Sequence, residues 1–312
     1  MNQLSMDFVR VTEAAAIAAS AWIGTGEKEE ADRAATEEMR DRLNRLDFAA
    51  EVVIGEGKKD ASHGLFCGEV VGSRRDLRGA DPRYTICVDP IEGTRPTVTS
   101  GPEALSVLGV AAAGSLLASE RFYGLKLAYG PRIAQQGEPP VDAPLGEILA
   151  AASRALNRPV DKIVVCILDR PRHKGMIEEL RRLGARIKLI QDCDVSGALA
   201  TCRPDSGVDL LYGVGGVPEG VITACAMKCL GGRIQMQMAD DDGRVQPGRI
   251  YAGNDMVRGD CIFAATGITD GSLLRGVRFT ERGPVTHSVF MRSASGTVRW
   301  LTTEHGNRPR SS

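Results

Sequence analysis

The chain has 312 residues, of which 43% are hydrophobic and 25% are charged, the composition of an ordinary globular protein. The formal net charge is −1 and aromatic residues make up only 4%, so we expect neither a nucleic-acid partner nor an anionic membrane surface. A chain of this length exceeds the size at which one simple core usually stops growing. We therefore expect two tightly packed subdomains within a single compact unit.

The cysteines and the apolar segments indicate the environment of the protein. Eight cysteines are scattered along the chain and none forms a C-x-x-C pair, which is typical of reduced thiols in a cytoplasmic protein. The longest apolar stretch, 104–118, is broken by serine and glycine and is too short to span a bilayer. We expect a cytoplasmic protein without a membrane partner.

Apolar periodicity predicts an α/β protein. Helical spacing at 7–22 and 28–46 predicts two helices, and short apolar runs predict strands at 51–55, 84–88 and 105–113. A proline-rich stretch at 137–144 separates an N-terminal subdomain, 1–140, from a C-terminal subdomain, 141–312. Strands and helices alternate in the second subdomain, which favours a largely parallel sheet. Its predicted strands are 163–168, 186–190 and 209–214, and its predicted helices are 174–183, 195–201 and 221–230.

The segment Asp89-Pro-Ile-Glu-Gly-Thr94 is the sharpest chemical signal. Two carboxylates and a backbone carbonyl at one turn supply the oxygen ligands that hard divalent cations prefer. Taken alone, the same residues would equally suit a surface turn that ends a strand. The pattern recurs, however, because Glu56 and Glu219 also follow apolar strands within glycine-rich turns. Carboxylates at the ends of separate strands can converge at one edge of a sheet.

Each of the other acids also has a purely structural interpretation. Glu219 could cap a helix, and Asp32 could form a solvated ion pair with Lys28, four residues away. The donor set is nevertheless all oxygen, and the four histidines lack the spacing of metal ligands. Such a set favours Mg²⁺ or Mn²⁺ over zinc.

Five ordered motifs resemble those of the class II (GlpX-type) fructose-1,6-bisphosphatases, and the likeness runs from about residue 15 to about residue 274. The element at 89–94 also resembles the wider lithium-sensitive phosphatase superfamily, which includes inositol monophosphatases. The resemblance implies a layered αβαβα sugar-phosphatase fold and a homo-oligomer, either a dimer or a tetramer. The motifs are Trp22-Ile-Gly-Thr-Gly-Glu-Lys28 with Asp32, Val53-Ile-Gly-Glu56-Gly with Asp60, Asp89–Thr94, Pro171-Arg172-His173 and Gly215-Gly-Val-Pro-Glu219-Gly220.

The resemblance also implies a role for each site residue. Thr94 and Asp60 would orient and deprotonate the attacking water, and Lys28 would neutralise charge beside the acids. The implied metal ligands are Asp32, Glu56, Asp89, the Ile91 carbonyl, Glu92 and Glu219. The implied substrate-binding residues are Gly93, Thr94, Tyr123, Arg170, Arg172, Asp192, Asp194 and Gly215.

The implied activity is metal-dependent removal of the 1-phosphate of fructose 1,6-bisphosphate by direct attack of a metal-activated water. Sedoheptulose 1,7-bisphosphate is a second candidate substrate. Two alternatives stay open at this point: an inositol-monophosphatase-like phosphomonoesterase and a catalytically silent sugar-phosphate sensor. Departures from the family's pattern at 61–63, 118–120 and Cys193 lie near the loops expected to face the sugar, so they bear on the substrate and not on the metal ligands.

Overall fold

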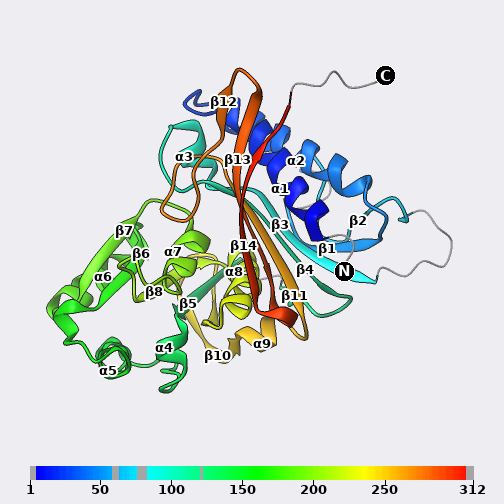
Figure 1. Ribbon diagram of the computed structural model, residues 1–312. Coiled ribbons are helices and arrows are strands. Elements are labelled where there is room, and N and C mark those ends of the chain that lie inside the picture. The colour runs from blue at the N-terminus through cyan, green and yellow to red at the C-terminus, as the bar shows by residue number, and fades with distance from the viewer. Residues whose placement is uncertain (1–4, 58–62, 76–82, 120–121, 307–312) are drawn as a thin grey trace. The chain divides into compact units, whose positions relative to one another are not determined.

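The computed structural model describes residues 5–57, 63–75, 83–119 and 122–306, which form two compact units (Figure 1). The first unit contains residues 1–109, 262–291 and 297–312, and the second contains 110–261 and 292–296. The boundary expected at residue 140 therefore falls inside the second unit. Strand pairing explains this division, because C-terminal strands return to the sheet of the first unit, and such long-range pairing cannot be read from composition along the chain.

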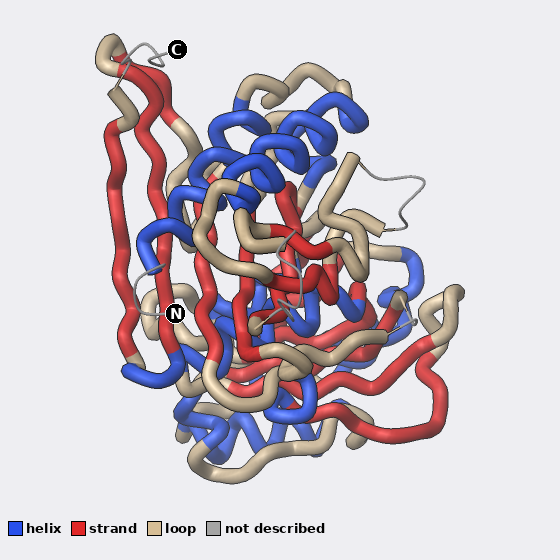
Figure 2. The backbone as a smooth tube through the Cα atoms, turned by 90° about the vertical axis from the view of Figure 1, so that its right-hand side faces the viewer, coloured by secondary structure: helices blue, strands red, loops and turns tan. Residues whose placement is uncertain are grey.

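The first unit is built on an eight-stranded sheet with the order β12-β13-β11-β4-β3-β1-β2, in which β14 pairs with β13. β1 and β3 are parallel, whereas β1 and β2 are antiparallel. Figure 2 shows β13 and β14 side by side as two long strands. The strands are β1 Ala50–Ile54, β2 Val70–Val71, β3 Tyr84–Glu92, β4 Leu105–Ala112, β11 Cys261–Gly267, β12 Arg278–Thr280, β13 Gly283–Arg292 and β14 Thr297–Glu304.

Two amphipathic helices, α1 (Ser5–Ser20) and α2 (Lys28–Asn44), pack against each other and against β3 (Figure 1). Four alanines of α1, Ala14, Ala15, Ala16 and Ala19, are buried and leave little side chain between the helix and its neighbours. Met39 and Leu43 lie on the buried stripe of α2, as the helical spacing predicted. This packing holds α2 beside the end of β3, where the acidic residues of the first unit lie.

The second unit is built on a six-stranded sheet with the order β10-β9-β5-β8-β6-β7. β6 pairs in parallel with β7 and β8, whereas β5 pairs antiparallel with β8 and β9. The expected largely parallel sheet is thus correct only for the three strands that were predicted there. The strands are β5 Tyr123–Tyr129, β6 Val164–Leu168, β7 Arg186–Ile190, β8 Leu210–Gly216, β9 Arg233–Ala239 and β10 Val245–Ala252.

Helices cover both faces of this second sheet. Val165 and Ile167 of β6 belong to a buried cluster that includes residues of α5 and α6, whereas Cys166 of the same strand lies beside Gly197 of α7. No helix in the described part of the chain is long and apolar enough to cross a membrane. The remaining helices are α3 Thr94–Val98, α4 Pro131–Ala134, α5 Leu145–Leu156, α6 Lys174–Arg182, α7 Asp194–Ala200, α8 Val217–Leu230 and α9 Gly253–Met256, with 3₁₀ turns η1 Val160–Lys162, η2 Pro171–His173 and η3 Ser293–Ser295.

The α/β class is confirmed, and most predicted elements end within a few residues of the observed ones. β3 is the informative exception, because it continues four residues beyond the predicted end at 88, to Glu92. Pro90 lies beyond the predicted end of the strand, yet it is buried within the observed strand. Asp89 and Glu92 therefore belong to a strand, whose backbone is more tightly constrained than that of a loop.

Candidate functional site

In the first unit, the end of β3 brings two carboxylates together. Oxygens of Asp89 and Glu92 lie within 4.8 Å of each other, and Asp89 Oδ1 accepts a hydrogen bond of 3.0 Å from the Ile91 amide. Gly93 follows with φ +100°, a left-handed conformation that strongly favours glycine, and precedes the first residue of α3. The strand thus ends in a sharp turn that keeps both acids next to the amino end of α3.

Glu56 reaches the same edge of the eight-stranded sheet from the neighbouring strand. β1 is parallel to β3, and Ile54 pairs with Cys87, so Glu56 follows β1 at the level where Asp89 follows Cys87. The Glu56 backbone is fixed by a hydrogen bond of 2.9 Å from its amide to the Leu65 carbonyl. Parallel pairing therefore places Glu56 and Asp89 at one end of the sheet, as the recurrence of the motif predicted.

Thr94, the first residue of α3, contacts Asp32 on α2. The Thr94 hydroxyl donates a hydrogen bond of 2.8 Å to Asp32 Oδ1. Burial raises the pKa of Asp32, and this hydrogen bond and the nearby charge of Lys28 oppose the rise. Lys28 itself is exposed at the first position of α2. The expected partner of Thr94, Asp60, lies outside the described residues, so their pairing stays a prediction.

In the second unit, the arginine predicted to bind phosphate is held from two sides. Nε and Nη2 of Arg172 donate to the Val214 carbonyl at 3.1 and 2.9 Å, and the guanidinium lies 5.0 Å from the centre of the Tyr123 ring. Burial lowers the pKa of Arg172. Arg170 forms an ion pair of 3.6 Å with Asp192. The predicted arginines, tyrosine and aspartate are therefore neighbours, and the orientation of the Arg172 fork is fixed before any ligand binds.

Sequence reasoning missed Lys126, which is only 1% exposed and forms a buried ion pair with Asp194. Its ammonium also donates a hydrogen bond of 3.0 Å to the Gly216 carbonyl. A Cβ at Gly215 would come within 2.2 Å of Asp194 Oδ2, so only glycine fits beside the pair. A signal was present in the sequence, because Lys126 is the only charged residue in the apolar strand 123–129.

Glu219, in the first turn of α8, has a buried oxygen whose chemistry suits a cation. Its Oε2 is buried and has no hydrogen-bond partner in the described chain. Burial raises the pKa of Glu219, and the charge of Lys126 opposes that rise. A buried carboxylate oxygen without a donor is costly unless a cation neutralises it. An oxygen of this kind suits a hard divalent metal, which prefers oxygen ligands.

Cys193 lies between the two predicted sugar-facing aspartates and adopts φ +67°. Non-glycine residues rarely occupy this left-handed region. Glycine would adopt this backbone shape without strain, whereas cysteine adopts it at a cost. The turn at Cys193 leads directly into α7, which begins at Asp194.

His173 links the strands β6 and β8 of the second unit through hydrogen bonds of its ring. Its Nε2 accepts a hydrogen bond of 2.8 Å from the Val214 amide, so its Nδ1 carries the proton and donates to the Leu168 carbonyl at 2.7 Å. The ring is fully buried and links β6 to β8 directly beside Arg172. Burial, with the charges of Arg172 and Arg170, lowers the pKa of His173 and keeps the ring neutral.

The comparisons with known proteins agree with this geometry. The sequence matches the family described as bacterial fructose-1,6-bisphosphatase, glpX-encoded, over residues 2–305. The chain belongs to this family of metal-dependent phosphatases. Two relatives, from Synechococcus elongatus and Synechococcus sp., are 39% identical, and one from Synechocystis sp. is 38% identical; each alignment covers 97% of this chain and 96% of the relative. All three relatives are named D-fructose 1,6-bisphosphatase class 2/sedoheptulose 1,7-bisphosphatase.

The neutral state of His173 predicts a pH dependence of stability. Because the pKa of His173 is lower in the folded protein, the unfolded chain takes up the proton first as the pH falls. This contribution to stability is complete above about pH 6.5, the ordinary histidine pKa, and is lost progressively below it. Urea unfolding between pH 7.5 and 5 should show a steeper loss of stability for the wild type than for His173→Gln.

The matched control is His287→Gln, which alters a half-buried histidine of the first unit whose pKa is also lowered, chiefly by burial. Its effect on the pH slope should be smaller, since less of that ring is removed from water. The slope, and not the absolute stability, is the readout, because either substitution can remove a hydrogen bond. Equal slopes for the wild type and His173→Gln would contradict the neutral, bracing role of His173.

Proposed function

We propose that this chain hydrolyses fructose 1,6-bisphosphate at the 1-phosphate by direct attack of water, and that sedoheptulose 1,7-bisphosphate is a second substrate. The match to the fructose-1,6-bisphosphatase family over residues 2–305 carries the proposal. The names of the three cyanobacterial relatives support both substrates. The acids at the end of β3 and the fixed arginine fork in the second unit are the two chemical features that such a reaction needs.

The proposed cofactor is Mg²⁺ or Mn²⁺. When bound, the cation would acidify a water molecule and balance negative charge on the phosphate. The partnerless oxygen of Glu219 and the paired acids of β3 support this assignment, because hard cations take oxygen ligands. The proposed ligands are Asp32, Glu56, Asp89, the Ile91 carbonyl, Glu92 and Glu219.

Thr94 and Asp60 are the proposed pair that orients the attacking water and accepts its proton. The hydrogen bond from Thr94 to Asp32 supports a fixed direction for this hydroxyl, since a rotating hydroxyl would position water poorly. Lys28 is proposed to balance the negative charge around Asp32, a role that its effect on the Asp32 pKa supports. No covalent phospho-enzyme is required in this scheme.

The proposed substrate contacts divide between phosphate and sugar. Arg170 and Arg172 would hold the second phosphate, because a guanidinium fork matches phosphate oxygens. Asp192 and Asp194 would accept hydrogen bonds from sugar hydroxyls, while the ion pair with Lys126 holds Asp194 in place. The remaining proposed contacts are Gly93, Thr94, Tyr123 and Gly215.

We also propose that the protein works in the cytoplasm as a homo-oligomer. The eight cysteines support the first point, since all seven that are buried or half-buried, and Cys67 on the surface, are free thiols. The family resemblance supports the proposed homo-oligomer.

Phosphate release by the purified protein tests the proposed activity. Metal-stripped protein should release phosphate only after Mg²⁺ or Mn²⁺ is added. Of three substrates, fructose 1,6-bisphosphate should give a higher kcat/KM than sedoheptulose 1,7-bisphosphate or inositol 1-phosphate. A preference for inositol 1-phosphate would show that the proposed sugar-binding residues were assigned to the wrong substrate. Tight binding without release from any of the three would identify a silent sensor.

Asp89→Asn should abolish turnover, because an amide cannot replace a charged ligand for a divalent cation. The matched control is Asp47→Asn, which changes an exposed carboxylate of the first unit that pairs with Arg74. Steady-state phosphate release at saturating Mg²⁺ compares the two variants. Activity of Asp89→Asn near that of the wild type would exclude Asp89 as a ligand.

Thr94→Ala should reduce kcat by roughly 10²–10⁴-fold, the usual effect of losing a positioned acid–base group, and should leave substrate binding intact. Thr94→Ser keeps the hydroxyl and should retain most of the activity. Separate measurements of kcat and of substrate Kd distinguish the two roles. An unchanged kcat for Thr94→Ala would show that the hydroxyl takes no part in activating water.

A further inference from the structure

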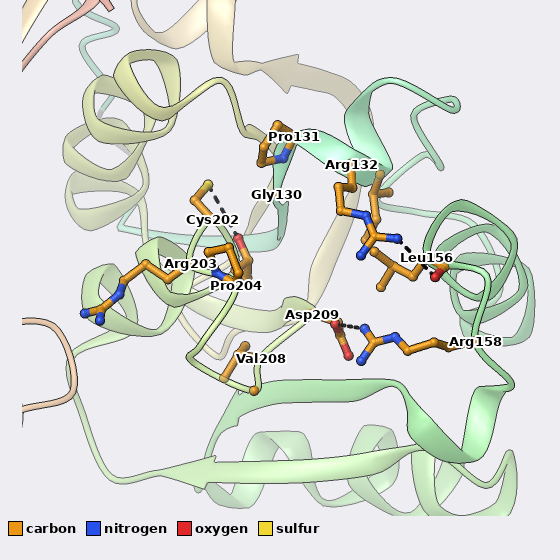
Figure 3. A pocket seen from close by; sticks show the side chains of 13 residues that line it. Gly130, Pro131, Arg132, Leu156, Arg158, Cys202, Arg203, Pro204, Val208 and Asp209 are labelled. Atoms are coloured by element: carbon orange, nitrogen blue, oxygen red, sulfur yellow. Dashed lines mark hydrogen bonds and ion pairs between the residues drawn. The ribbon is translucent and has the colours of Figure 1, made fainter. Parts of the chain in front are cut away.

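A pocket with a volume of about 260 Å³ lies at the end of the six-stranded sheet where β5 ends and β8 begins (Figure 3). All of its lining residues belong to the second unit. Its walls are formed by the turn that begins α4, the end of α5 and the loop between α7 and β8.

This pocket is separate from the proposed substrate residues. β5 and β8 pair antiparallel from Tyr123 opposite Gly216 to Tyr129 opposite Leu210. Six steps along a strand at about 3.3 Å each amount to about 20 Å. Tyr123 and the glycine-rich turn lie at one end of this strand pair, and the pocket adjoins the other end. A ligand in the pocket therefore does not occupy the substrate-binding loops.

The lining carries three arginines and one aspartate, so its net charge is positive. The guanidinium groups of Arg132 and Arg158 face the same space from opposite sides (Figure 3). Arg203 points away from that space and pairs with Asp205 at 3.1 Å. Two of the three positive groups thus converge on one position.

Both converging arginines are held in place by groups on the rim. Arg132 Nη2 donates to the Leu156 carbonyl at 3.2 Å, its one hydrogen bond within the described residues. Arg158 pairs with the carboxylate of Asp209, whose Oδ2 accepts a hydrogen bond of 2.9 Å from the Val164 amide. Fixing the guanidinium groups in advance reduces the entropy that a ligand must overcome on binding.

Arg158 also has a donor that the protein does not satisfy. Its Nε is buried and has no hydrogen-bond partner in the described chain. Such a donor is costly, and a negative charge close to the guanidinium would offset part of that cost. The surrounding side chains of Pro131, Ile133, Leu156 and Val208 offer no competing acceptor, and apolar walls with a few convergent polar groups are typical of small-molecule sites.

We propose that this pocket binds a small phosphorylated anion at a site distinct from the substrate loops. Two guanidinium forks that converge from opposite sides match the several oxygens and the double negative charge of a phosphate ester. A single Asp209 balances only Arg158, so one positive charge remains at Arg132 for the ligand. The small volume fits a compact metabolite and excludes an extended polymer.

Isothermal titration of the full-length protein with inorganic phosphate tests the proposal, both with Mg²⁺ present and with EDTA. One binding component should be present under both conditions, because the pocket contains no proposed metal ligand. Arg132→Ala should weaken that component by about ten- to a hundredfold, the usual effect of losing a charge-assisted hydrogen bond. Arg132→Lys should be intermediate, since it keeps the charge but loses the fork.

Arg203→Ala is the matched control, because it removes the same charge from the same rim on a side chain that points elsewhere. Its affinity should stay within about twofold of the wild type, an effect well below one charge-assisted hydrogen bond. Wild-type affinity in Arg132→Ala, or an equal loss in Arg203→Ala, would overturn the proposal. Arg132 is exposed, so circular dichroism should show a folded variant.

Acetate in place of phosphate tests the chemical class of the ligand. Binding of acetate as tight as that of phosphate, with the same dependence on Arg132, would overturn the phosphate assignment in favour of a carboxylate. This test does not depend on the proposed activity, because phosphate release from sugar bisphosphates is measured separately. If phosphate binding at the pocket is not observed, the measurement of phosphate release remains interpretable, and the reverse also holds.

Discussion

The buried ion pair between Lys126 and Asp194 holds the second unit's candidate site together. It joins the middle of β5 to the first residue of α7, and the same ammonium binds the Gly216 carbonyl at the end of β8. Removing either partner of such a pair would leave an uncompensated buried charge, which typically costs about 3–5 kcal/mol. This arrangement requires glycine at position 215, because any side chain there would occupy the space of the ion pair.

The first unit reaches a comparable rigidity by a different route. Its acids stand at the ends of parallel strands, so the hydrogen bonds of the sheet determine where Glu56 and Asp89 lie. Gly93 then turns the chain so that Thr94 begins a helix directly after the acids, with its hydroxyl on Asp32. Backbone pairing positions the charged groups in this unit, whereas a side-chain ion pair does so in the other.

Sequence reasoning succeeded where a local pattern determines the geometry and failed where distant segments decide it. The acids of β3 were predicted because strand, proline and glycine lie within six residues. The contact between Thr94 and Asp32 joins residues 62 positions apart and has no local signal. Lys126 was overlooked because a lysine within an apolar strand equally suits an exposed edge, and only the position of β5 between β8 and β9 shows that it is buried. The antiparallel strands β5, β9 and β10 were not predicted, so the sheet was expected to be more parallel than it is.

Cys193 forms the centre of the turn between Asp192 and Asp194, the two aspartates proposed to bind the sugar. The left-handed backbone at this position points the flanking aspartates and begins α7, and it persists although the residue is not glycine. Its side chain is 2% exposed, so it fills interior space that a glycine would leave to its neighbours. The turn therefore does not require glycine between the two aspartates, and the residue there can add a side chain to the packed interior without changing the direction of the chain.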